Sequence, residues 1–212
     1  MMFIFNRYFL IVVFFVVNNI ALAQIKKENL KLGLSYGTGS QNKFPFNSKD
    51  YSHEITFYKA VINYKILEKK DWSYEINIEP SYNLAEHQLL NKWFIKPTDS
   101  ENYLELRDLY TQNRTIKEYV LNLGFLARYN IYNNLSAYAL GSVGPMIADK
   151  PTERLAKGFA FSDVFGLGLS YRIGQAQLDF RYSLRHTSNL QLKVPNEGHN
   201  TTNIEFSVLY KM

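Results

Sequence analysis

Apolar and polar side chains alternate along several stretches of this chain, and this period of two constrains the fold more than any other feature. From Trp72 to Asn83, apolar or aromatic residues occupy the even positions and polar or charged residues occupy the odd ones. Successive side chains on a strand point to opposite faces, so this segment predicts a strand with one apolar and one polar face. Its length of about eleven residues suits a tilted crossing of a bilayer. The same alternation recurs over residues 119–131, 165–173 and 203–212.

The sequence predicts an all-β fold, an eight-stranded antiparallel transmembrane β-barrel of the bacterial outer membrane. Eight is the smallest even number of strands found in such barrels. Asn133–Asn134 and Gly174–Gln175 predict short turns on one side of the membrane, whereas the longer links fall on the other side. A soluble all-β domain is the alternative, although its strands are usually only about five or six residues long. The expected strands are 29–38, 52–66, 71–84, 117–132, 134–146, 158–173, 175–189 and 200–212.

The N-terminal segment predicts export from the cytoplasm. Arg7 precedes an almost unbroken apolar run over Tyr8–Val17, and the small-residue pattern Ala21–Leu22–Ala23 follows. This order is typical of a secretory signal peptide over residues 1–23, which leaves a barrel over residues 24–212. An uncleaved membrane anchor is the alternative, but the apolar run is short for a membrane-spanning helix.

Composition limits the partners that this chain is expected to have. The net charge is +5 without a basic block, so nucleic acid is not an expected partner, whereas an anionic lipid surface is compatible. The chain has no cysteine, so no disulfide framework is expected. Tyrosine and phenylalanine are abundant, as in the aromatic girdles of membrane barrels.

One predicted strand, 175–189, breaks its own pattern near its end. Leu178, Phe180, Tyr182 and Leu184 make its lipid face, and the same alternation places His186 and Ser188 on that face. Polar groups facing lipid are costly, but a site for a membrane-embedded ester requires that direction. An imidazole two residues from a hydroxyl on one face can act as its base. The alternative is that both residues lie above the hydrocarbon, wetted and inert.

The surrounding residues resemble the PagL-like outer-membrane lipid A 3-O-deacylase family. The resemblance lies in the run Phe180–Asn189, in Leu192–Gly198 after it, and in Lys157–Asp163 entering the sixth strand. The family pattern is His-x-Ser-Asn, then a Pro-Asn-x-Gly turn, then a last strand. The resemblance implies an eight-stranded serine esterase that hydrolyses the 3-linked acyl ester of lipid A in the outer leaflet. It implies no cofactor.

The resemblance also implies roles for individual residues. Ser188 is expected to be the nucleophile and His186 the general base, which later protonates the leaving sugar hydroxyl. Asn189 is expected to support the oxyanion through its backbone or its side-chain amide. The residues expected to shape the turn into the last strand are Pro195, Asn196 and Gly198.

The third catalytic position departs from the family pattern. The acidic residue usually follows the glycine by two positions, and here that position holds Asn200. Asn200 has the right parity to lie on the side of His186, and an amide can orient an imidazole without supplying charge. Glu205 has the wrong parity, whereas Glu197 lies in the turn and is the alternative, since it could swing over to His186. Asn200 is the expected third member of the catalytic group.

The other titratable residues are expected to be structural. His53 and His87 are interpreted as isolated and His199 as a loop residue, so no metal site is predicted. Charged residues on the polar faces are expected to form ion pairs inside the barrel. They are Glu75, Glu79, Arg128, Arg172, Asp179, Arg181 and Arg185.

Two other functions remain open at this level. A non-catalytic barrel with a structural or adhesive role would carry His186 and Ser188 without using them. An outer-membrane acyltransferase would use the same residues with an alcohol in place of water. The expected partner of the leading hypothesis is lipid A, the membrane anchor of lipopolysaccharide, and the sequence leaves open whether the barrel forms a homodimer.

Overall fold

The computed structural model describes residues 26–212 as a closed barrel of eight antiparallel strands. Each strand pairs with the next along the chain, and β1 pairs with β8 to close the ring. The predicted fold is therefore confirmed. The predicted signal peptide, residues 1–23, lies outside the described residues. The strands are β1 (Leu30–Ser40), β2 (Tyr51–Lys69), β3 (Trp72–Leu89), β4 (Arg114–Tyr132), β5 (Leu135–Ala148), β6 (Gly158–Ile173), β7 (Ala176–Ser188) and β8 (His199–Lys211).

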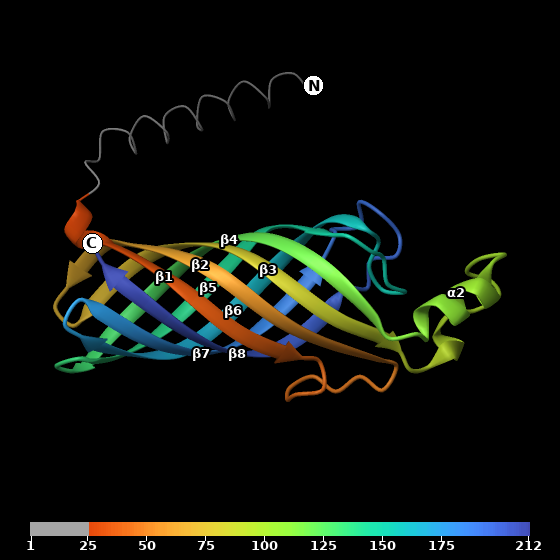
Figure 1. Cartoon of the computed structure of the whole chain (residues 1–212), viewed down its shortest axis with the longest axis horizontal. Coiled ribbons are helices and arrows are strands. Elements are labelled where there is room, and N and C mark those ends of the chain that lie inside the picture. Colours follow the sequence, from red (N-terminus) through yellow and green to blue (C-terminus); the bar gives the residue numbers. More distant parts are fainter. Residues whose placement is uncertain (1–25) are drawn as a thin grey trace, which may run out of the picture.

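The two ends of the barrel differ, as the sequence predicted (Figure 1). One end, the turn end, holds the short connections 70–71, 133–134 and 174–175 together with the C-terminus. The other end, the loop end, holds the connections 41–50, 90–113, 149–157 and 189–198. The longest loop contains η2 (Lys92–Phe94) and α2 (Tyr103–Tyr110). Long loops face the outside in outer-membrane barrels, so the loop end is the extracellular end.

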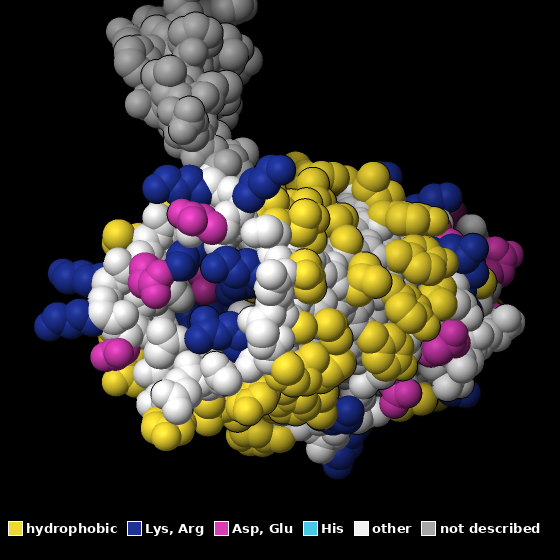
Figure 2. Space-filling model, turned by 60° about the vertical axis from the view of Figure 1, so that its left-hand side comes forward, with side chains coloured by type: hydrophobic (Ala, Val, Ile, Leu, Met, Phe, Trp, Pro, Cys, Tyr) yellow, Lys and Arg dark blue, Asp and Glu magenta, His cyan; other side chains and the backbone are white. Residues whose placement is uncertain are grey.

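Apolar side chains cover the flank of the barrel. Leu34, Leu121 and Phe165, from three different strands, are more than 45% exposed although they are large and apolar. Figure 2 shows such side chains spread over the flank, with charged side chains gathered toward the two ends. In water this surface would be a liability, whereas in a bilayer it meets lipid tails. In residues 26–212, no helix is long and apolar enough to span a membrane.

Buried ion pairs fill the middle of the barrel. The Arg181 guanidinium lies 2.9 Å from Glu79 and 2.6 Å from Glu205. Lys59 completes this group, at 3.2 Å from Glu79 and 2.8 Å from Glu205. Two cations therefore face two anions, and the layer is neutral. Such geometry is what a buried charge requires, because an unpaired one loses its hydration without compensation.

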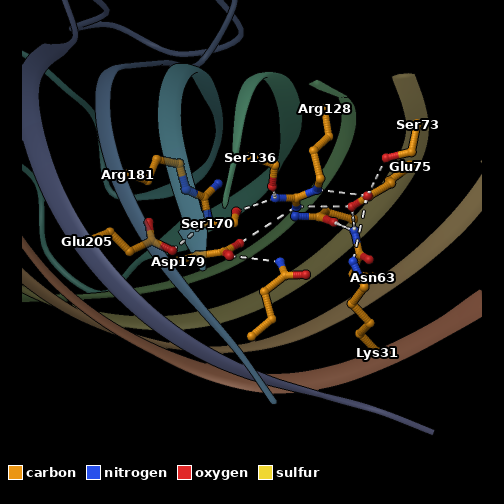
Figure 3. Close-up of polar contacts among 12 residues, drawn as sticks. Lys31, Asn63, Ser73, Glu75, Arg128, Ser136, Ser170, Asp179, Arg181 and Glu205 are labelled. Carbon is orange, nitrogen blue, oxygen red and sulfur yellow. Dashed lines mark hydrogen bonds and ion pairs between the residues drawn. The ribbon is translucent and has the colours of Figure 1, made fainter. Parts of the chain in front are cut away.

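A second neutral layer lies closer to the turn end (Figure 3). Arg128 donates to Glu75 at 2.9 Å and lies 3.8 Å from Asp179. Lys31 lies 3.7 Å from Glu75. Figure 3 shows Arg128 and Arg181 entering the lumen from different strands, with the Asp179 carboxylate between them. The lumen is therefore filled by side chains, as in other small barrels.

The predicted interior pairing holds for the remaining inward charges with one exception. Arg185 donates to Glu118 at 2.8 Å, closer to the loop end. Arg172 was expected in the interior, but it is exposed. It follows the inward alternation yet lies at the mouth of the barrel, where its strand ends and water reaches it.

At the loop end the outer face reverses from apolar to polar, since Glu86 and Thr115 bond each other there. Inside, a buried apolar cluster that includes Ile55, Ala85 and Ile116 lies beside buried polar side chains such as His87. The strands therefore continue past the lipid. This reversal explains why β3 runs to Leu89 and β4 begins at Arg114, beyond the predicted limits of 84 and 117.

Removing the central cation is expected to destabilise the barrel strongly. Arg181→Ala leaves two buried carboxylates, Glu79 and Glu205, to share the single cation Lys59. Breaking a buried pair in this way costs about 3–5 kcal/mol, measured as the free energy of unfolding in urea. The control is Arg172→Ala, which removes the same charge at an exposed position and is expected to cost less than about 0.5 kcal/mol. Equal effects of the two substitutions would contradict the structural role of the layer.

Candidate active site on the outer face of β7

The alternation of β7 continues to the end of the strand and places His186 on the lipid-facing side. His186 is exposed and Ser188 is half-buried, whereas Arg185 and Thr187 between and beside them are buried in the barrel. Residues two apart on a strand share a face, so His186 and Ser188 project in the same direction. The structure therefore places both residues where the sequence predicted them.

Asn200 lies directly opposite His186 on the neighbouring strand β8. The Asn200 Oδ1 atom is 2.8 Å from His186 Nδ1. An amide oxygen only accepts hydrogen bonds, so Nδ1 carries the proton and donates it. This tautomer leaves the lone pair of Nε2 free to take a proton from another group. The bond to Asn200 is the hydrogen bond that the His186 side chain makes in the structure. Asn200 thus orients the imidazole ring in the way expected of a third catalytic residue.

An acidic residue that sequence reasoning missed lies on the other side of His186. Asp163 of β6 is in register with His186 and is exposed on the same outer face. Directly opposed residues hold their Cβ atoms about 4.5–5.5 Å apart, which brings a carboxylate within reach of the imidazole. The signal was present in the sequence, since the outward alternation of Phe165 and Leu167 extends back to position 163.

The hydrogen-bonding groups of Asn189 bind within the loop that follows β7. Its backbone N–H donates to Asn196 Oδ1 at 2.6 Å, and its side-chain Nδ2 donates to the Lys193 carbonyl oxygen at 2.8 Å. The residue is fully buried. Both of the donors that the sequence suggested for oxyanion support therefore make hydrogen bonds within the loop, and the oxyanion role of Asn189 stays a prediction.

The predicted turn residues fix the approach of β8 to β7. Asn196 anchors Asn189, as above, and the Pro195 carbonyl accepts from the backbone N–H of Ala156 at 3.0 Å. Gly198 has a φ of +69°, and a Cβ there would lie 2.1 Å from the Thr187 carbonyl oxygen. Only glycine fits so close an approach with that backbone conformation. The turn therefore sets the spacing that brings Asn200 to His186.

An apolar groove of about 760 Å³ runs from this polar group across the outer face of the barrel. It crosses neighbouring strands because Leu184, Phe165 and Gly141 lie in one register row. Gly141 forms the floor, and the space outside it is open, since an added Cβ would meet nothing within 4 Å. The residues that the polar group contributes to the lining are Asp163, His186 and Asn200.

The loop 41–50 borders the same groove from the side of β8. Thr202 donates to the Phe44 carbonyl oxygen at 2.9 Å, and the Tyr182 hydroxyl donates to it at 2.8 Å. These bonds bring Phe46 into the lining beside His186. No motif in the loop indicated this contact, because it depends on the closure of β1 against β8.

Comparison with known proteins identifies the family. A sequence profile of the family described as lipid A 3-O-deacylase (PagL) matches residues 56–208. The chain belongs to the lipid A 3-O-deacylase family. No curated protein sequence matches this chain.

Solved structures similar to this deacylase-family chain are outer-membrane barrels. The crystal structure of the outer membrane enzyme PagL is 12% identical, with a TM-score of 0.53, and the match covers 84% of this chain and 97% of that one. Neisserial surface protein A (NspA) is 10% identical, with a TM-score of 0.52 and coverage of 87% and 97%. At such identities the likeness shows the fold alone, and together with the family match it supports a location in the bacterial outer membrane.

The interpretation of the remaining histidines was wrong for this member of the lipid A 3-O-deacylase family. His53, His87 and His199 lie together inside the loop end, and each is at most 3% exposed. His199 is the first residue of β8 rather than a loop residue. Their positions are far apart in the sequence, so only the closure of the barrel brings them together.

Adding one methyl group to the turn glycine is expected to destabilise the site. Gly198→Ala places a Cβ against the Thr187 carbonyl and 3.3 Å from His186 Cε1. Strain of this kind costs about 1–3 kcal/mol, which would lower the urea midpoint of unfolding. Gly141→Ala is the control, because its Cβ meets open space. A midpoint for Gly198→Ala equal to that of the control would contradict the close approach.

Proposed function

We propose that this chain is a lipid A deacylase that hydrolyses the ester-linked acyl chain at the 3-O position, with Ser188 as nucleophile and His186 as general base. The observation that supports the proposal most is the group of polar side chains on a lipid-facing surface. His186, Ser188, Asn200 and Asp163 face outward from three adjacent strands. Polar and ionisable residues in such positions are expensive and are retained where they serve a function.

The proposed chemistry starts with His186. With Nδ1 donating to Asn200, Nε2 takes the proton of the Ser188 hydroxyl as its oxygen attacks the ester carbonyl carbon. The tetrahedral intermediate collapses, the bond to the sugar oxygen breaks, and His186 returns the proton to that oxygen. Water then attacks the acyl-serine and gives a proton to His186. When the bond between the acyl carbon and the Ser188 oxygen breaks, His186 returns that proton to the Ser188 oxygen and the free fatty acid leaves. No cofactor takes part in these steps.

In this proposal, Asn200 and Asp163 together replace the acidic residue of a catalytic triad: Asn200 orients the imidazole and Asp163 supplies the negative charge. Asn200 orients the imidazole through its amide oxygen but cannot neutralise the charge that His186 gains. Asp163, in register on the opposite side, supplies a negative charge close to the imidazolium. The carboxylate thus comes from Asp163 of β6, while Asn200, at the position that usually holds the acidic residue in the family, only orients the imidazole.

The groove gives the acyl chain a place beside the proposed base, His186, while Ser188 lies two residues further along the same face and outside the lining. It is lined mainly by apolar side chains, and it ends at Asp163, His186 and Asn200. A lipid in the outer leaflet reaches this surface by lateral diffusion, so its ester meets Ser188 without leaving the membrane. The apolar groove therefore supports a lipid ester as the substrate rather than a water-soluble one.

Replacing the nucleophile or the base is expected to abolish deacylation. We expect lipid A from cells expressing wild type to lose one hydroxyacyl chain, and lipid A from cells expressing Ser188→Ala or His186→Ala to keep it, as measured by mass spectrometry. Losing a triad member lowers the rate by roughly 10⁴-fold or more.

The matched control is Ser207→Ala, the same change at a buried interior position of β8. It is expected to leave deacylation intact. Free fatty acid among the products is expected for a hydrolase, whereas its absence together with a new acyl ester would point to a transferase. Unchanged lipid A with folded wild-type barrel in the outer membrane would refute the proposal.

Moving the negative charge tests the role of Asp163. Asp163→Asn is expected to lower kcat by roughly 10-fold or more, because the imidazolium loses its nearest carboxylate. The double substitution Asp163→Asn with Asn200→Asp returns a carboxylate to the imidazole from the other side and is expected to recover much of the lost rate. Full activity of Asp163→Asn alone would show that the charge at position 163 plays no part.

A further inference from the structure

Three of the four histidines of this chain converge inside the loop end of the barrel. His53 of β2, His87 of β3 and His199 of β8 each offer one ring nitrogen, and these nitrogens lie within 4.8 Å of one another. All three residues are buried. The arrangement is separate from the lipid-facing polar group, because the three side chains point into the barrel.

Two of the rings approach each other through the same kind of atom. His53 Nδ1 and His87 Nδ1 are 3.1 Å apart. Two nitrogens that bind one tetrahedral zinc ion at about 2.0–2.1 Å are separated by about 3.3 Å, close to this spacing. The His53 and His199 rings are also near, with centroids 4.4 Å apart and the planes nearly perpendicular.

A carboxylate holds the far side of His87. His87 Nε2 lies 2.8 Å from Glu153 Oε2, and both side chains are buried. If Nε2 carries the proton and donates it to Glu153, the lone pair of Nδ1 points toward His53. Metal-binding histidines usually make this kind of bond to a carboxylate through their second nitrogen.

Hydrogen bonds inside the cluster leave two buried polar atoms without a partner. His199 contacts Thr152 Oγ1 through Nε2 at 3.1 Å, whereas its Nδ1 has none. Glu153 Oε1 is also buried and without a partner. A buried polar atom that makes no bond costs about 1–3 kcal/mol, so a ligand that engages these atoms would be stabilising.

The charges around the cluster favour a cation. Arg154 is paired with Glu197 at 3.0 Å and Arg185 with Glu118 at 2.8 Å. These two cations are therefore already neutralised. Glu153 adds a carboxylate, and its partner in the structure is the His87 side chain. A neutral imidazole does not neutralise the negative charge of that carboxylate.

We propose that His53, His87 and His199 bind a zinc-like divalent transition metal ion, with Glu153 holding His87 in the binding orientation. Imidazole nitrogens suit zinc, nickel, cobalt and copper, whereas calcium and magnesium prefer oxygen. The ion would join β2, β3, β8 and the loop 149–157 at the extracellular mouth. This assignment is independent of the proposed ester hydrolysis.

The test uses Co²⁺ alone as the probe, added to the full folded barrel purified without a polyhistidine tag. We expect about one equivalent of Co²⁺ to give the visible absorption bands of a four-coordinate ion, and Zn²⁺ to displace it. Replacing His53, His87 or His199 with alanine, one at a time, is expected to weaken binding at least 10-fold. His186→Ala is the matched control, because it removes the one remaining histidine and is expected to leave binding unchanged.

Glu153→Gln serves if an alanine variant fails to fold. It keeps the size of the side chain and is expected to weaken binding by roughly 10-fold to 100-fold, as does the loss of other carboxylates that hold a metal-binding histidine. A folded wild-type barrel that gives no absorption bands would overturn the proposal, as would equal binding in all the cluster variants. Neither result bears on lipid A hydrolysis, because no lipid substrate is present.

Discussion

The structure depends on buried ion pairs that link opposite strands across the lumen of the barrel. The group formed by Arg181, Lys59, Glu79 and Glu205 joins β2, β3, β7 and β8 across the lumen. A buried charge is stable only when an opposite charge compensates for its lost hydration, and this layer meets that condition with two cations facing two anions, although Arg181 Nε makes no hydrogen bond. Because the backbone pairing and the inward side chains hold the strands together, the outward side chains are free to face lipid and to serve chemistry.

Because inward and outward residues alternate, hydrogen bonds inside the barrel also hold the backbone that carries the candidate site. Arg185 precedes His186, and Ser162 precedes Asp163; inside the barrel, Arg185 Nε donates to Ser162 Oγ at 2.9 Å. An interior bond therefore lies directly behind the outward pair on the two strands. Sites carried by rigid strands hold their geometry better than sites on loops, provided that neighbouring side chains are locked. His186 and Asp163 therefore stay opposite each other without a bond between their side chains.

The sequence predicted what depends on local alternation and missed what depends on closure. The lipid face, and the side on which His186 and Asn200 lie, follow from parity along single strands. Asp163 shares that parity, but its nearness to His186 depends on the register between β6 and β7. His199 gave no local signal, since its neighbours in the barrel come from two distant strands.

The filled lumen has a consequence for the cell that makes this protein. Within residues 26–212, side chains such as Arg128 and Tyr138 enter the interior and stack on each other, so the lumen is filled by side chains rather than wide and water-filled as in porins. The outer membrane protects a bacterium by excluding detergents and large antibiotics. Copies of this chain can therefore be inserted without adding a wide aqueous pore through the lumen of each barrel.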